Sequence, residues 1–94
     1  MLNKTYTDDL TKIGDQFIEV YISNQNEILY NGKAKAFNSE NSLGKFSIIP
    51  KHTNFRSIIY KKMSVIPLIG DKKNFIFTKG VLSFSENKLE VYIV

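Results

Sequence analysis

The chain has 94 residues, carries a formal net charge of +4, and contains no cysteine and one histidine. These counts exclude a disulfide scaffold and a zinc site of the ordinary Cys/His type. The length corresponds to one domain, and a chain of this size buries only about 60–65% of its unfolded surface. The 43% of hydrophobic residues, including 13% aromatic residues, are enough to build an efficient core.

Residues 1–16 are polar and show no strand pattern. Leu10, Ile13 and Phe17 are spaced three and four apart, and Thr7 is a suitable helix cap, so we predict an N-terminal arm that is flexible or forms a short helix. The start has no hydrophobic signal core, and no apolar run approaches the roughly 20 residues that span a bilayer. We therefore expect a soluble, intracellular protein.

From residue 17 the pattern is that of β-strands. Residues 17–23 are rich in β-branched and aromatic side chains, and residues 24–26 are typical of a turn. Residues 27–30 read as a second strand that ends at Asn31-Gly32, the strongest hairpin signal in the chain. Residues 33–37 then alternate lysine with apolar side chains, which predicts one wet face and one packed face.

The second half of the chain continues in the same way. Residues 38–42 are expected to form a polar loop, and residues 46–49 a buried strand that ends at Pro50. Further strands are predicted at 55–60, 63–69, 75–78, 81–84 and 89–94. The last of these is so apolar that we expect it to be paired inside the sheet. Residues 17–94 are thus predicted to form one all-β domain, a flattened sandwich or barrel of about eight to ten short, mostly antiparallel strands.

No group of residues predicts catalysis. No serine lies in a Gly-x-Ser-x-Gly elbow, the five glycines form no phosphate-binding loop, and no carboxylate pair is placed across a cleft. We therefore predict no catalytic residue, no cofactor and no metal site.

The positive charge is uneven, because residues 45–79 contain eight basic residues and one acidic residue, Asp71. One interpretation is a surface for an anionic partner. The other is an AT-biased genome, because Lys, Asn, Ile, Phe and Tyr are all abundant in the chain. Segments 60–62 and 72–75 interleave lysines with aromatic residues, so a basic β-barrel that binds single-stranded nucleic acid is an alternative function. Period-2 alternation instead places those rings in the core.

Three landmarks in the chain resemble one family. Residues 18–32 are similar to its opening hairpin, residues 44–52 to its Gly-x-aromatic-Gly-Ile-Leu-Pro-x-His signature, and residues 78–92 to its closing strand pair. The family is the epsilon subunit of rotary F-type ATP synthases (delta in mitochondria), and the resemblance covers its N-terminal β-sandwich domain. The spacing between the first two landmarks needs no gap, and the three together make the resemblance specific.

The resemblance implies a mechanical role. In the family this domain is a non-catalytic rotor subunit of a proton- or sodium-translocating enzyme, and it binds the gamma subunit and the ring of c subunits. By position, the implied gamma-subunit contacts are Ser23, Asn24 and His52, and the implied c-ring contacts are Ser42, Leu43, Gly44, Lys45 and Phe46. The implied location is the cytoplasmic face of the bacterial inner membrane, or its organellar equivalent, peripheral to the bilayer and without direct insertion. No nucleic acid is expected as a partner.

The chain also departs from the family pattern. Ser47 and Lys79 stand where the family has glycines, and Asn54 stands where it has a proline. Lys45 stands at an often acidic position and would repel a basic c-ring loop. The family's C-terminal helical hairpin has no counterpart, so we expect coupling without the regulation that the hairpin provides. These departures leave open a second alternative, an epsilon-like sandwich that serves as an adaptor for other partners.

Overall fold

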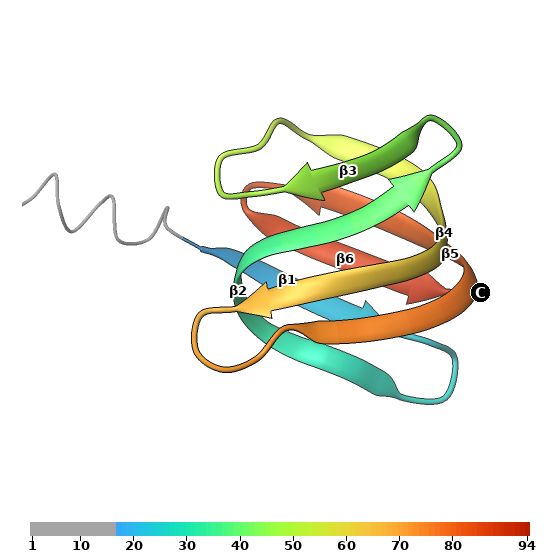
Figure 1. The fold of residues 1–94 in the computed structure, drawn as a ribbon, viewed down its shortest axis with the longest axis horizontal. Coiled ribbons are helices and arrows are strands. Elements are labelled where there is room, and N and C mark those ends of the chain that lie inside the picture. Colours follow the sequence, from blue (N-terminus) through green and yellow to red (C-terminus); the bar gives the residue numbers. More distant parts are fainter. Residues whose placement is uncertain (1–16) are drawn as a thin grey trace, which may run out of the picture.

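The computed structural model describes residues 17–94, so the predicted N-terminal arm lies outside the described residues. The described part contains six strands and no helix (Figure 1). The strands are β1 (Ile18–Ser23), β2 (Ile28–Asn41), β3 (Gly44–Ile48), β4 (Phe55–Pro67), β5 (Lys73–Ser85) and β6 (Lys88–Ile93). The all-β class predicted from the sequence is confirmed.

The sheet closes on itself. The strand order is β1-β6-β5-β4-β2-β3, and β1 also pairs with β2, so that β1, β6, β5, β4 and β2 form a closed barrel with β3 at an edge. The β1–β6 pair is parallel and the other pairs are antiparallel. Strand β6 lies between β1 and β5, which confirms the prediction that the apolar last strand is paired on both sides.

The barrel is flattened into two layers because three long strands pass from one layer to the other. The β3 layer contains β3, the later halves of β2 and β4, and the first half of β5. The β1 layer contains β1, β6, the first halves of β2 and β4, and the later half of β5. The pairing shifts between Ala34 and Ala36 in β2 and between Tyr60 and Lys62 in β4, where Lys61 adopts a left-handed φ of 72°. Such bulges bend a strand, and here they mark the crossings.

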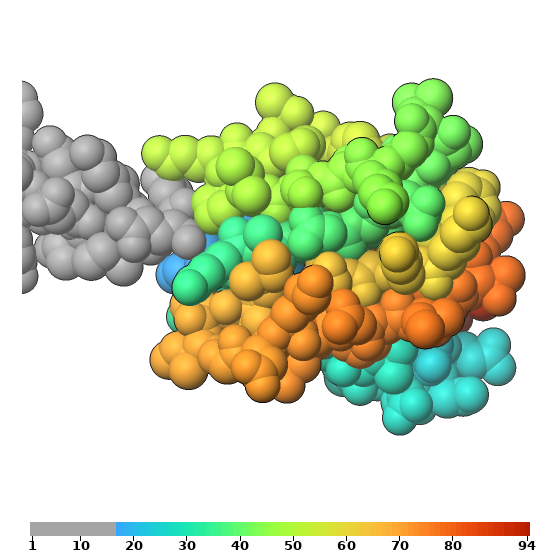
Figure 2. Space-filling model, in the orientation of Figure 1, coloured from blue at the N-terminus to red at the C-terminus, as the bar shows by residue number. Residues whose placement is uncertain are grey.

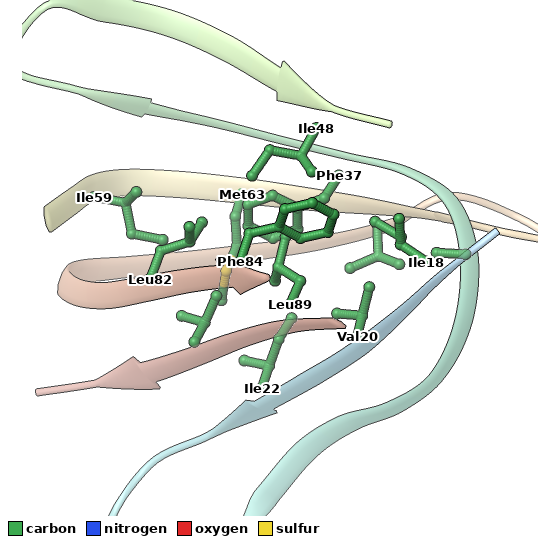
Figure 3. Close-up of a cluster of buried hydrophobic side chains, with 13 residues drawn as sticks. Ile18, Val20, Ile22, Phe37, Ile48, Ile59, Met63, Leu82, Phe84 and Leu89 are labelled. Atoms are coloured by element: carbon green, nitrogen blue, oxygen red, sulfur yellow. The ribbon is translucent and has the colours of Figure 1, made fainter. Parts of the chain in front are cut away.

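The core fills the space between the layers (Figure 3). Alternate residues of β1 point inward, and Phe37 and Phe84 are the largest of the side chains that are almost fully buried. Each such aliphatic or aromatic side chain contributes about 1.5–3 kcal/mol when it leaves water. The buried hydrophobic residues are Ile18, Val20, Ile22, Ala34, Phe37, Ile48, Ile59, Met63, Val65, Leu82, Phe84, Leu89 and Val91.

The number of strands is lower than predicted because two expected breaks in β2 do not occur. Gly32 lies opposite Val20 inside the β1–β2 ladder and has no positive φ, so Asn31-Gly32 is not a hairpin turn. Residues 38–41 pair with β3, and Asn38 also pairs with β4, so this segment is strand rather than loop. The pairing with neighbouring strands overrides the local turn signal.

Two further expected pairs of strands are continuous. The predicted strands 55–60 and 63–69 join into β4, and 75–78 and 81–84 join into β5. Strand β3 also differs from the prediction, because it is an edge strand with a buried Ile48 and an Ile49 that is 55% exposed. Strands β5 and β6 are joined by the two-residue connection Glu86-Asn87, in which both residues have a positive φ.

Candidate interaction surface

An apolar row crosses the outer face of the β1 layer. Ile58 lies opposite Val81, and Val81 lies opposite Tyr92. Tyr92 lies opposite Ser23, and Ser23 lies opposite Ile28, so the row spans all five strands of the layer. The exposed fractions are 42% for Ile58, 49% for Val81, 46% for Tyr92 and 55% for Ile28. The apolar row, as it is called below, consists of Ile58, Val81, Tyr92, Ser23 and Ile28.

Two more exposed side chains extend the apolar row. Tyr21 is 36% exposed and points to the same face as Ser23, because it lies two residues before it in β1. Val94 is 73% exposed, and its backbone N–H donates to the carbonyl oxygen of Lys79 at 3.0 Å, beside Tyr92. The outer face of an antiparallel sheet is normally polar, so a contiguous apolar patch indicates a docking surface.

The neighbouring row is polar and forms one rim of this surface. Arg56 lies opposite Ser83, and Ser83 lies opposite Glu90. These residues are two positions along their strands from the apolar row, so they point to the same face. A shallow hollow of about 490 Å³ lies where the two rows meet on β4 and β5. It is lined by Arg56, Ser57, Ile58, Val81, Leu82 and Ser83. An apolar centre with a polar rim is the usual anatomy of a protein–protein interface.

Two of the residues implied as gamma contacts lie at this surface. Ser23 is half-buried in the apolar row, between Tyr92 and Ile28. Asn24 begins the β1–β2 turn, where its Oδ1 accepts hydrogen bonds from the backbone N–H groups of Asn26 and Glu27, each at 2.8 Å. This Asx turn fixes the loop beside Ile28 and confirms the turn predicted at 24–26.

The structure places His52 at the other end of the barrel. Its ring contacts the rings of Phe55 and Phe84 edge-on, with centroid distances of 5.8 and 5.9 Å. Phe84 pairs with Leu89, near the start of β6, whereas Ser23 pairs with Tyr92, near its end. In Figure 1 the loop that contains His52 and the turn that follows Ser23 lie at opposite ends. His52 is therefore not brought together with Ser23 and Asn24.

Local contacts fix the His52 loop. The backbone N–H of His52 donates to the carbonyl oxygen of Ile49 at 3.1 Å, which closes a turn that has Pro50 and Lys51 at its centre. Lys51 has a φ of 69°, and its N–H donates to Oδ1 of Asn87 at 2.8 Å. The ring atom Nδ1 of His52 lies 2.7 Å from the carbonyl oxygen of Thr53. The loop after β3 is thus anchored to the β5–β6 turn.

The segment implied as the c-ring contact forms the β2–β3 hairpin. Ser42 and Leu43 are the turn residues, Oδ1 of Asn41 accepts from the N–H of Leu43 at 2.9 Å, and Gly44 has a φ of 125° that side chains rarely adopt. Leu43 is 95% exposed at the tip. In Figure 1 this hairpin and the turn at Asn24 lie at the same end of the barrel.

The two remaining residues of the hairpin segment point in different directions. Lys45 is exposed and lies opposite Glu40 on the outer face of the β3 layer. Phe46 is partly buried, and its ring centroid lies 5.1 Å from that of Phe55. Phe46 therefore supports the core, while Lys45 is available to a ligand.

The sequence contained a signal for the apolar row that alternation alone does not explain. Consecutive apolar residues occur in three strands of this layer, as Ile58-Ile59 in β4, Val81-Leu82 in β5 and Tyr92-Ile93 in β6. One member of such a pair must face outward, so the pairs indicate a sheet that is apolar on both faces. Residues 17–94 contain no cluster of three or more potential metal-ligating side chains and no helix long and apolar enough to cross a membrane.

The fold is similar to chains in two solved ATP synthase assemblies. One is in the OSCP/F1/c-ring structure of the Euglena gracilis mitochondrial ATP synthase, with a TM-score of 0.78 at 13% identity over 84% of this chain and 51% of that chain. The other is in the central stalk/c-ring structure of the Tetrahymena thermophila mitochondrial ATP synthase, with a TM-score of 0.70 at 13% identity over 82% of this chain and 63% of that chain.

This likeness supports the resemblance noted in the sequence at the level of the fold. The chain spans about half to under two thirds of the length of these structural relatives. No family model and no curated protein matches the sequence. The fold is thus one found in components of the ATP synthase central stalk and c-ring assembly.

Proposed function

We propose that this chain is a non-catalytic rotor component of the central stalk of an F-type ATP synthase, where it binds the gamma subunit and the c ring. The observation that carries the proposal is the fold similarity to the Euglena assembly, at a TM-score of 0.78. A rotor component transmits torque, which requires a rigid body that grips two partners. The closed barrel with its close-packed core meets that requirement.

The apolar row supports a contact with gamma. It is the contiguous apolar part of the outer face of the β1 layer, and it includes Ser23, which Asn24 follows in the chain. We propose that gamma covers this surface. A partner that also touched His52 would have to extend along the length of β6, so His52 contributes to gamma binding only at the far margin of the contact.

The β2–β3 hairpin supports a contact with the c ring. Leu43 projects from the tip of the hairpin, and Ser42 and Gly44 shape the turn that carries it. Lys45 lies on the outer face of the β3 layer rather than at the tip, so it does not have to meet a basic ring loop directly. In this arrangement the protein is peripheral to the membrane and couples ion movement, of protons or sodium, to ATP synthesis.

The proposal is tested by photo-crosslinking in the assembled enzyme. A photoreactive residue replaces Leu43, Ile28 or, as a control, the loop residue Ile69, which is 91% exposed. We expect the full-length protein to co-purify with ATP synthase subunits from the cells that express it. Position 43 should cross-link to subunit c and position 28 to gamma, while position 69 gives neither product.

The same experiment separates the alternatives. Co-purification with defined proteins outside the ATP synthase supports the adaptor function, because a fold does not fix its partners. Recovery of nucleic acid without any ATP synthase subunit supports the nucleic-acid alternative. Either result overturns the proposed function.

A further inference from the structure

A second concave surface lies on the outer face of the β3 layer, away from the apolar row. It is a groove of about 620 Å³ to which β3, β2, β4 and β5 all contribute. Figure 2 shows this side of the molecule, where β2 and β3 (green), β4 (yellow) and β5 (orange) lie next to one another. This surface is called the lysine groove below.

A polar ladder runs across the middle of the lysine groove. Ser47 lies opposite Asn38, Asn38 opposite Ser64, and Ser64 opposite Asn74. The Ser47 hydroxyl donates to Oδ1 of Asn38 at 2.5 Å, and Nδ2 of Asn38 donates to the Ser64 hydroxyl at 3.4 Å. Four strands spaced about 4.8 Å apart give the ladder a span of about 14 Å, the length of four to five residues of extended peptide.

Lysines surround this ladder. Lys45 on β3, Lys62 on β4 and Lys72 just before β5 line the groove, and Glu40 is the one acidic residue among the lining side chains. Glu40 lies opposite Lys45, which leaves the charges of Lys62 and Lys72 without an acidic side chain in the lining. All three lysines are exposed. Carboxylates that approach this surface are attracted from solution.

We propose that the lysine groove binds an extended acidic segment of a protein partner. The ladder supplies side-chain amides and hydroxyls to a crossing peptide, and the lysines neutralise its carboxylates. Ile76, which is 91% exposed at the border of the groove, offers an apolar contact for a side chain between two acidic residues. This inference does not depend on the function proposed above, because it concerns the opposite layer.

The placement of the aromatic residues favours peptide over single-stranded nucleic acid. Nucleic-acid grooves of this type stack bases on exposed rings. The two phenylalanines among the lining residues, Phe46 and Phe75, are partly buried and pack against the core. Ile76, the most exposed apolar residue of the lining, has no ring. A ligand of this groove therefore gains from charge and hydrogen bonding rather than from stacking.

Fluorescence anisotropy with the full-length protein tests the inference. The probe is a labelled peptide of alternating glutamate and isoleucine, compared with a lysine–isoleucine peptide and a thymidine oligonucleotide of the same length. We expect only the acidic peptide to bind, with an affinity that falls as salt is raised. The double variant Lys62→Glu/Lys72→Glu should weaken that binding by at least about tenfold.

A matched variant controls for overall charge. Lys79→Glu/Lys88→Glu makes the same change in net charge at exposed positions of the β1 layer and should bind the acidic peptide within about twofold of the unmodified protein. Equal losses in both double variants would mean that the attraction is unspecific and would overturn the inference. Binding of the oligonucleotide alone, or of no probe at all, would overturn it too. Neither double variant changes a residue of the apolar row or the β2–β3 hairpin. A failure of this inference is therefore distinguishable from a failure of the proposed function, which the crosslinking experiment tests.

Discussion

Replacing Val81 with glutamate tests whether the apolar row is the surface on which gamma docks. Val81 lies between Ile58 and Tyr92 and is 49% exposed. Burying a whole valine side chain contributes about 1.5–3 kcal/mol, so covering the exposed half contributes about 1 kcal/mol to binding. A glutamate loses this contribution and must also shed water from its carboxylate, which costs at least about 2 kcal/mol more. The sum of about 3 kcal/mol corresponds to a loss of affinity of about 100-fold or more.

The assay is calorimetric titration of the full-length protein with purified gamma, paired with a thermal melt of each variant. Because the side chain at position 81 faces outward, Val81→Glu should change the free energy of unfolding by no more than about 1 kcal/mol. Ile69→Glu serves as the control, since Ile69 is 91% exposed in the β4–β5 loop, outside the apolar row. Its affinity for gamma should match that of the unmodified protein. A folded Val81→Glu variant that binds gamma with unchanged affinity would refute the reasoning.

Three further substitutions test the fold by urea unfolding. Phe37→Ala should lower the free energy of unfolding by about 3–5 kcal/mol, because Phe37 is fully buried and its truncation leaves a cavity; a loss below about 1 kcal/mol would contradict the packing. Gly80→Ala should lower it by about 1–2 kcal/mol, since the new methyl group would lie 3.3 Å from the carbonyl oxygen of Tyr92; a stabilised variant would show that the backbone yields there. Glu86→Asn should raise it by about 0.5 kcal/mol, because asparagine tolerates the positive φ of 52° at this turn position better than glutamate; no gain would mean that the turn relaxes.

The class of the fold and the positions of most strands were predictable from local pattern. Residues 17–23 became β1 and residues 89–94 became β6, because β-branched and aromatic side chains suit a pleated, half-buried surface. The position of β6 between two neighbours followed from its apolar character alone. The parallel pairing of β6 with β1, which closes the barrel, joins segments at opposite ends of the domain and has no local signature.

The hairpin turn predicted at Asn31-Gly32 was wrong, and it shows where prediction from local sequence fails. The asparagine–glycine pair permits a tight turn, but both residues instead pair with β1, and the ladder satisfies their backbone groups. The hairpin that does form, at Ser42 and Leu43, is fixed by the hydrogen bond from the Leu43 N–H to the Asn41 side chain. The predicted polar loop at 38–42 overlaps this turn only at Ser42, its last residue.

The candidate surfaces could be predicted only in part, for a similar reason. Ser23, Asn24 and the hairpin residues came from the family resemblance, and the structure places them at one end of the barrel, with His52 at the other. The apolar row joins residues from five strands, so it exists only once the register between them is known. The lysine groove likewise joins four strands, although the excess of basic residues between 45 and 79 was visible in the sequence.

Strand β5 shows how one irregularity decides which side chains face a partner. Phe75 and Phe77 are partly buried against the core, and unbroken alternation from them would bury Val81 and expose Leu82. The opposite is found, since Val81 is 49% exposed and Leu82 is 0% exposed. At the pairing shift, residues 77 and 78 of β5 lie opposite Lys61 alone, and this one extra residue in β5 inverts the alternation. The same strand therefore presents Ile76 to the lysine groove and Val81 to the apolar row, so that the two proposed binding surfaces are joined through one continuous, rigid element.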